Sequence, residues 1–177
     1  MRVALTAVSV VVVIVGAVVL GLFLWLRTYA PLGASTPYEP GPGLGADVEP
    51  TFGSGGKTVF IPAYRKGRPF DAQVTLRNDG RFAVTVTGIQ SPGGPLSPAQ
   101  LLDPSHDTPL RNLRLDPQDT ALVVVRWTLD CSHTGRQVTS DRVRLRYRYL
   151  SMFTRMQTVE LPFAVTLRCS GGPPASP

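Results

Sequence analysis

The chain has 177 residues, of which 18 are basic and 12 acidic, so its formal net charge is +6, and it has only two cysteines. The positive charge favours acidic partners. No nucleophile elbow, phosphate-binding loop or paired-carboxylate signature is present, so we expect no enzyme activity and no cofactor. The two cysteines lack CxxC spacing, and no HExxH pattern occurs, which argues against a metal centre.

The first predicted element is a hydrophobic helix between Val3 and Leu26. These 24 residues carry no charge. At a helical rise of about 1.5 Å per residue they cover roughly 36 Å, enough for a hydrocarbon core of about 30 Å. We therefore expect residues 1–27 to form a transmembrane anchor in contact with the lipid bilayer. A cleaved signal peptide is the alternative, but its apolar region usually has about 7 to 15 residues.

The flanking charges predict that the N-terminus is cytoplasmic. Arg2 and the α-amine precede the apolar segment, whereas Arg27 alone follows it, which gives a slight positive-inside preference. Two cysteines in a β-rich chain suit a disulfide in an oxidising compartment. The sequence therefore predicts a bacterial single-pass membrane protein whose C-terminal domain is extracytoplasmic.

Residues 28–56 change in composition and are predicted to be a linker. Twelve of these 29 residues are proline or glycine, and no hydrophobic period could bury a face. A flexible coil of this length would separate its ends by about 30 Å on average. The folded domain is therefore expected to begin near Lys57.

Residues 57–169 are predicted to form one all-β domain, an Ig-like antiparallel β-sandwich of about seven strands. Alternating apolar and polar residues recur at a regular pace, and no helical period competes with them. The expected strands are residues 57–63, 70–77, 82–89, 110–115, 120–129, 142–150 and 158–167. Residues 91–109 contain five prolines and are expected to be a crossing loop, with room for a helical turn at 98–102. Residues 170–177 are expected to be a disordered tail.

Residues 70–89 contain the best local turn signal. They read FDAQVTLRNDGRFAVTVTGI, in which Asn78, Asp79 and Gly80 separate two alternating runs, the pattern of a tight β-hairpin. This segment resembles the Ig-like bacterial surface modules related to the ASPM-SPD-2-Hydin and NEW3 groups. The resemblance implies an Ig-like sandwich that serves as a stalk, spacer or binding module and is not itself an enzyme. It implies no functional residue.

The last three strands are expected to form a meander, and their alternation places both cysteines on the inward side. The odd-numbered residues from 121 to 129 lead to Cys131, and those from 159 to 167 lead to Cys169. In one flat sheet these two strands would hold the Cα atoms about 9.6 Å apart, beyond the disulfide limit of about 7 Å. We therefore expect a disulfide that closes across the sandwich or below its rim. Pro162 is expected to mark an edge strand.

The most unusual predicted surface consists of Arg142, Arg144, Arg146 and Arg148. Period two places all four on one side of a strand, in a row about 20 Å long. From Lys57 onward the chain has sixteen basic residues and nine acidic ones. This face is thus a candidate contact for an anionic cell-envelope polymer, a lipid headgroup or an acidic protein.

The arginine face also has a purely structural interpretation and an expected set of neighbours. The alternative interpretation is that the arginines only keep an exposed strand from pairing with other chains. A simple antiparallel register would set Arg148 opposite Glu160, the one acidic residue on the neighbouring strands. Nucleic acid is not an expected partner, because this face lacks stacking aromatic residues.

Three further groups have weaker signals. The basic segment at residues 64–68 contains Gly67, which marks a turn, so solvated charge is preferred to a phosphate loop. Residues 105–107 read Ser-His-Asp, but adjacent side chains rarely form a triad. A soft-metal set is conceivable from residues 131, 133 and 169 with His106, Met152 and Met156, but a disulfide would consume both thiolates.

Together these features predict a membrane-anchored, extracytoplasmic and non-enzymatic binding module. Its job would be contact with an anionic or acidic partner through the arginine face. Two other classes stay open: a structural spacer or assembly subunit of an envelope complex, and a module that binds a metal or small ligand.

Overall fold

A computed structural model describes residues 2–35, 48–52, 57–65, 67–91, 93–132 and 137–169, without the side chains of residues 2–11 and 48–52. The chain divides into two compact units, Met1–Ala30 and Pro31–Pro177. The tail expected at residues 170–177 lies outside the described residues.

The first unit contains one long helix, α1 (Arg2–Arg27). The sequence has no proline before Pro31, so nothing interrupts the i to i−4 hydrogen bonds of the helix. Thr28 ends it and donates its hydroxyl to the carbonyl oxygen of Trp25 at 3.1 Å. Within the part of the chain whose side chains are described, no helix combines the length and the apolar character needed to cross a membrane.

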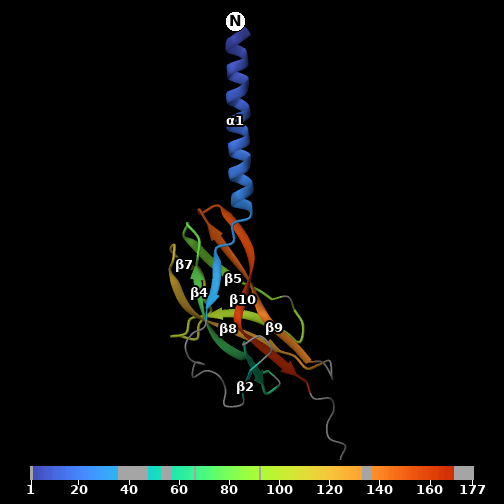
Figure 1. The fold of residues 1–177 in the computed structure, drawn as a ribbon. Helices are drawn as coiled ribbons and strands as arrows, with labels where there is room; N and C mark the ends of the chain where they lie inside the picture. Colours follow the sequence, from blue (N-terminus) through green and yellow to red (C-terminus); the bar gives the residue numbers. More distant parts are fainter. Residues whose placement is uncertain are drawn as a thin grey trace, which may run out of the picture. The chain divides into compact units, whose positions relative to one another are not determined.

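The second unit is a β-sandwich of two sheets (Figure 1). Ten strands are described, more than the seven expected. The four-stranded sheet has the order β1-β4-β8-β6 and the six-stranded sheet the order β2-β3-β10-β9-β5-β7; among these described strands only β3 and β10 pair in parallel. The strands are β1 (Leu32–Ser35), β2 (Val48–Phe52), β3 (Thr58–Pro62), β4 (Phe70–Asn78), β5 (Val84–Gln90), β6 (Leu96–Leu102), β7 (Leu113–Leu115), β8 (Thr120–Leu129), β9 (Gln137–Tyr149) and β10 (Phe153–Arg168).

The core lies between the two sheets and uses the alternating residues that the sequence indicates. Trp127 of β8 and Leu145 of β9 are both completely buried. One face of each strand is buried because successive side chains point to opposite faces of a sheet. Buried side chains on the main strands are Phe70, Ala72, Val74 and Leu76, then Val123, Val125 and Trp127, then Val143, Leu145, Tyr147 and Tyr149, and finally Val159, Leu161, Phe163, Val165 and Leu167.

The segment around Asn78 forms a crossing between sheets, so the hairpin prediction is wrong. β4 belongs to the four-stranded sheet and β5 to the six-stranded sheet. Neither Asp79 nor Gly80 has the positive φ that a two-residue hairpin turn requires. The Asn78 side chain is instead buried, with Nδ2 3.1 Å from the carbonyl oxygen of Leu115. An asparagine in this place thus directs the chain from one layer into the other.

The two segments predicted to lack strands both contribute to the sandwich. The expected linker, residues 28–56, contains β1, which pairs with β4, and β2, which pairs with β3. Residues 28–31 alone separate α1 from β1, and residues 36–47 lie outside the described residues. The expected loop at residues 91–109 contains β6, which pairs with β8. Pro98 is tolerated there because β6 is an edge strand with a register shift at that residue.

β9 and β10 form a long hairpin, but β8 does not join them in a meander. β8 lies in the other sheet, between β4 and β6. β10 is flanked by β3 and β9, so Pro162 does not mark an edge strand. It lies in an irregular stretch of β10, between Glu160 and Val165, where the pairing with β9 changes register. A bulge accommodates proline inside a sheet because no ladder hydrogen bond is needed from that residue.

Candidate functional site

The arginine row comprises Arg142, Arg144, Arg146 and Arg148, and β9 presents all four on the solvent-exposed face of the six-stranded sheet. Their side chains are exposed, whereas the alternating residues from Val143 to Tyr149 are buried in the core. The four buried side chains hold the strand against the other sheet. The arginines must then point outward, because successive side chains of a strand point to opposite faces of the sheet.

The neighbours of the arginine row come from β5 and β10. On β10, Arg142 faces Glu160 and Arg148 faces Thr154. The expected opposition of Arg148 and Glu160 is therefore wrong, because the hairpin turns at residues 150–152, earlier than expected. On β5, Thr85 faces Arg148.

β9 is an interior strand along most of the arginine row. It pairs with β10 on one side and, from Arg144 to Tyr149, with β5 on the other. Edge protection needs charges on a strand whose backbone is free to pair. The interpretation that the row only blocks strand pairing therefore loses its premise for Arg144, Arg146 and Arg148.

The acidic residues near the row are engaged by a lysine. Lys57 Nζ lies 3.1 Å from Asp141 Oδ2 and also donates to Glu160. Arg142 Nε approaches Asp141 more loosely, at 3.7 Å. Among the residues that the structure describes, Arg144, Arg146 and Arg148 form no ion pair. Most of the row thus keeps its positive charge uncompensated.

The pKa of Lys57 is raised above its ordinary value of 10.5, chiefly by its hydrogen bond to Glu160 and next by that to Asp141. A raised pKa means that the ion pairs contribute fully below pH 10.5 and are lost as the pH rises through the higher folded value. We expect Lys57→Gln to lower the free energy of unfolding at neutral pH. This difference from the unsubstituted protein should shrink in strongly alkaline solution. Urea unfolding at several pH values measures it, and a pH-independent difference would contradict the assignment.

One further arginine lies near the row, on β7. Arg114 is opposite Thr85 of β5, which in turn faces Arg148. Its guanidinium group is paired with Asp116 at 2.9 Å. The alternation Leu113-Arg114-Leu115 indicates that Arg114 points outward. No local sequence pattern indicates that β7 lies beside β5.

Arg126 belongs to a separate cluster on the outer face of the four-stranded sheet. It pairs with Asp71 through two hydrogen bonds of 2.9 and 2.7 Å and with Asp107 at 2.9 Å. These partners raise the pKa of Arg126, with the hydrogen bond to Asp71 as the largest cause. Arg126 therefore does not extend the arginine row.

The Ser-His-Asp letters at residues 105–107 do not form a triad arrangement. The Asp107 carboxylate accepts from Arg126, and His106 Nδ1 lies 3.5 Å from Asp103 instead. Asp103 also accepts from the backbone of Ser105 at 2.7 Å, and this bond is the main cause that lowers its pKa.

The other sequence candidates are structural. Gly67 has φ +77° and Arg68 donates its N–H to the Arg65 carbonyl oxygen at 3.0 Å, so a turn is confirmed there; Lys66 lies outside the described residues. The described part of the chain contains no group of metal-ligating side chains. His133 falls outside that part.

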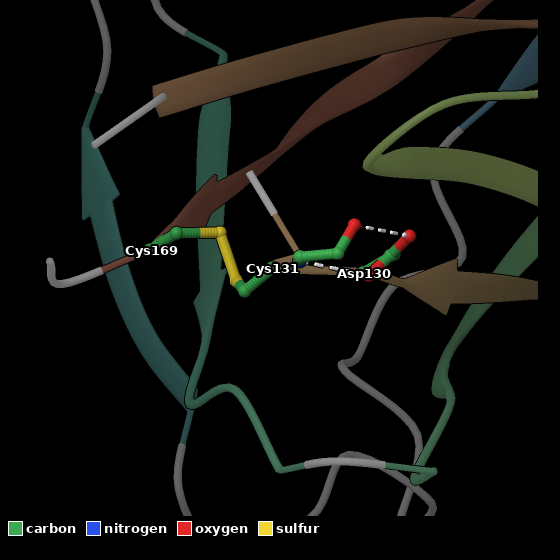
Figure 2. Close-up of a disulfide and its surroundings, with 4 residues drawn as sticks. Asp130, Cys131 and Cys169 are labelled. Atoms are coloured by element: carbon green, nitrogen blue, oxygen red, sulfur yellow. Dashed lines mark hydrogen bonds between the residues drawn. A yellow bond between two sulfur atoms is a disulfide. The ribbon is translucent and has the colours of Figure 1, made fainter. Parts of the chain in front are cut away.

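The two cysteines form the predicted disulfide across the sandwich. Cys131 follows β8 of the four-stranded sheet and Cys169 follows β10 of the six-stranded sheet, with Cα atoms 5.5 Å apart. Figure 2 shows the bond joining the segments beyond the two strand ends, next to Asp130. The prediction that the bond closes across the sandwich is confirmed, because β8 and β10 lie in different sheets.

Comparisons with known proteins do not assign the chain to a family. No family model matches it, and no curated protein is significantly similar. Among solved structures, the VesB protease of Vibrio cholerae aligns with TM-score 0.35 and 16% identity, over 70% of this chain and 32% of the protease. The chain therefore spans about a third of the protease's length.

A second solved structure is the ASH / PapD-like domain 7 of human CEP192. It aligns with TM-score 0.36 and 12% identity, over 78% of this chain and 95% of that domain. At such TM-scores neither likeness bears on function. The class defined by the structure is a disulfide-linked β-sandwich with a basic outer face, preceded in the sequence by a hydrophobic helix.

Proposed function

We propose that this protein is a non-enzymatic binding module of Ig-like type, whose arginine row contacts an anionic partner. The observation that carries the proposal is the interior position of β9. Arginines on an interior strand are not needed to block pairing, yet Arg144, Arg146 and Arg148 stand exposed without an ion pair among the described residues. An uncompensated row of this kind favours an acidic polymer, an anionic headgroup layer or an acidic protein face.

We also propose that α1 anchors the protein in the membrane with the sandwich outside the cell. Two features support this: α1 has 26 residues, about 39 Å at helical rise, and the sequence between Val3 and Leu26 has no charged side chain. A disulfide also suits an extracytoplasmic sandwich. Protease added to intact cells should remove the sandwich and leave an α1 fragment, whereas complete protection of the sandwich would refute this topology.

The arginine row can be tested with a soluble anionic probe. Full-length protein in zwitterionic detergent is titrated with poly(glycerol phosphate) at increasing salt. At about 1 kcal/mol per basic residue, Arg144→Gln/Arg146→Gln should weaken binding by about 2 kcal/mol, roughly 30-fold at low salt. The same substitution should also flatten the salt dependence.

A matched control removes two exposed arginines outside the row. Arg77→Gln/Arg111→Gln loses the same charge, and Arg77 is already paired with Asp79. It should leave binding within a few-fold. Equal losses of affinity in both double variants would show that binding depends on total positive charge and not on the row. No loss in either variant would refute the proposal.

The second candidate is an assembly role, in which the sandwich only docks against a protein partner. Such docking would not depend on the arginine row. Co-purification of one protein partner that survives Arg144→Gln/Arg146→Gln would favour it. The described residues offer no comparable observation for a metal-binding role, since both thiols are in the disulfide.

A further inference from the structure

A cavity of about 260 Å³ opens at one end of the arginine row. β5 ends at Gln90, opposite Arg144, so its pairing with β9 stops there. Among the described strands, none continues along that side of β9 from Gln137 to Val143. Pro98 of β6, from the other sheet, forms part of the wall. The cavity therefore exists because β9 is longer than its neighbour β5.

The cavity is lined by two apolar residues, Pro98 and Val143, and by five residues with polar side chains. Arg144 has Gln90 beside it on β5 and Thr158 beside it on β10, so these three side chains form one rung across the sheet. Side chains in such a rung have Cβ atoms about 4.5 to 5.5 Å apart. Arg142 is two residues along on the same face; Ser140 also lines the cavity, but its hydroxyl donates to the carbonyl oxygen of Arg142 at 3.4 Å. Two guanidinium groups, the hydroxyl of Thr158 and the amide of Gln90 can thus converge on one small ligand.

The charges at the cavity favour an anion. Its lining contains two arginines and no carboxylate. The carboxylates nearby are Asp141, which is shared between Lys57 and Arg142, and Glu160, which accepts from Lys57. Arg144 forms no ion pair with any described residue. A ligand anion would therefore meet one free guanidinium and one that is only loosely paired.

We propose that this cavity binds a single phosphate group, as a phosphomonoester or a phosphodiester of a larger molecule. The inference rests on the proposed anion contact of the arginine row and gives it a specific ligand group. The cavity is smaller than the pockets of about 300 Å³ or more that hold drug-sized ligands, so one charged group fits and the remainder of the molecule extends along the row. Donors on three strands, and at two positions along β9, suit a tetrahedral oxyanion better than a planar carboxylate, and arginine is well matched to phosphate.

The test follows the arginine side chains directly. Full-length 15N-labelled protein in zwitterionic detergent is titrated with inorganic phosphate, and the Nε–H resonances of the arginines are recorded. We expect saturable shifts for Arg142 and Arg144, and none for Arg148, which lies outside the cavity. Acetate at matched ionic strength should produce at most small shifts that do not saturate.

Matched variants separate the cavity from general charge. The shift at Arg142 gives an apparent dissociation constant for phosphate. Arg144→Gln should raise this constant at least tenfold, whereas Arg148→Gln, on the same strand and face, should change it by less than twofold. Thr158→Val keeps the shape of the side chain and should raise the same dissociation constant several-fold. Uniform, non-saturating shifts at all arginines, or an equal effect of Arg148→Gln, would overturn the proposal.

Two further titrations identify the source of the phosphate. Glycerol phosphate represents a soluble ester, and vesicles with and without phosphatidylglycerol represent a lipid headgroup. Saturation by glycerol phosphate alone indicates a soluble or polymeric ligand, and saturation only by the anionic vesicles indicates a headgroup. Binding of poly(glycerol phosphate) that needs Arg146 but causes no saturable shift at Arg144 would refute the cavity and leave the proposed function intact.

Discussion

Replacing Cys131 and Cys169 together by serine should lower the free energy of unfolding of the sandwich by about 3 to 4 kcal/mol. The disulfide joins residues separated by 38 positions. On the chain-entropy model, closing a loop of that length restricts the unfolded chain by about this amount. The bond also ties the ends of β8 and β10, which belong to different sheets. Urea unfolding of the full-length protein, monitored by tryptophan fluorescence, measures the loss.

The thiol count provides the control for this prediction. The denatured protein should show no reactive thiols before reduction and two after it. If the double variant does not fold, the native protein can be unfolded in urea with and without reductant, and the reductant should lower the midpoint. An unchanged midpoint, or two free thiols in the unreduced protein, would contradict the role assigned to the bond.

The second large effect is expected at Asn78. Its side chain is completely buried, and Nδ2 lies 2.9 to 3.1 Å from the carbonyl oxygens of Phe82, Leu115 and Asp116, while Oδ1 accepts from the N–H of Gly80 at 3.0 Å. Asn78→Ala removes every one of these bonds and takes away the acceptor of the Gly80 N–H. At about 1 to 3 kcal/mol for a buried polar group left unpaired, we expect a loss of about 3 kcal/mol or more.

Asp79 supplies the matched control in the same crossing. Its side chain is paired with Arg77 at the surface, and such pairs contribute about 1 kcal/mol or less. Asp79→Ala should therefore have a small effect in the same urea experiment. If Asn78→Ala is no more destabilising than Asp79→Ala, the buried network does not hold the crossing. Faster amide exchange at Gly80 in Asn78→Ala would locate the damage.

The errors in the strand predictions have a common physical origin. The signal at Asn78-Asp79-Gly80 is typical of a hairpin, because these residues suit tight turns. Whether the next strand folds back or crosses to the other layer depends on what Asn78 contacts, and Leu115 and Asp116 are distant in sequence. β1 and β6 were missed for a related reason: both are edge strands with little alternation, and β4 and β8 respectively hold them in place.

For the candidate site too, the sequence predicted the local arrangement but not the contacts between distant segments. Period two in residues 142–149 was sufficient to predict that the four arginines share a face. Their neighbours could not be predicted, since the pairing with β5 and the early turn at residues 150–152 decide which residues lie beside them. The cavity had no sequence signal at all, because it arises from the different lengths of β5 and β9.

The sequence by itself determined which side chains face the core, which face solvent, and which two cysteines pair, because alternation and cysteine number are properties of the chain alone. Only the tertiary structure decided how the strands divide between two sheets, and hence that β9 is an interior strand with an open cavity at the end of its arginines. Strand pairing depends on hydrogen bonds and packing between distant segments, and a local pattern does not contain that information.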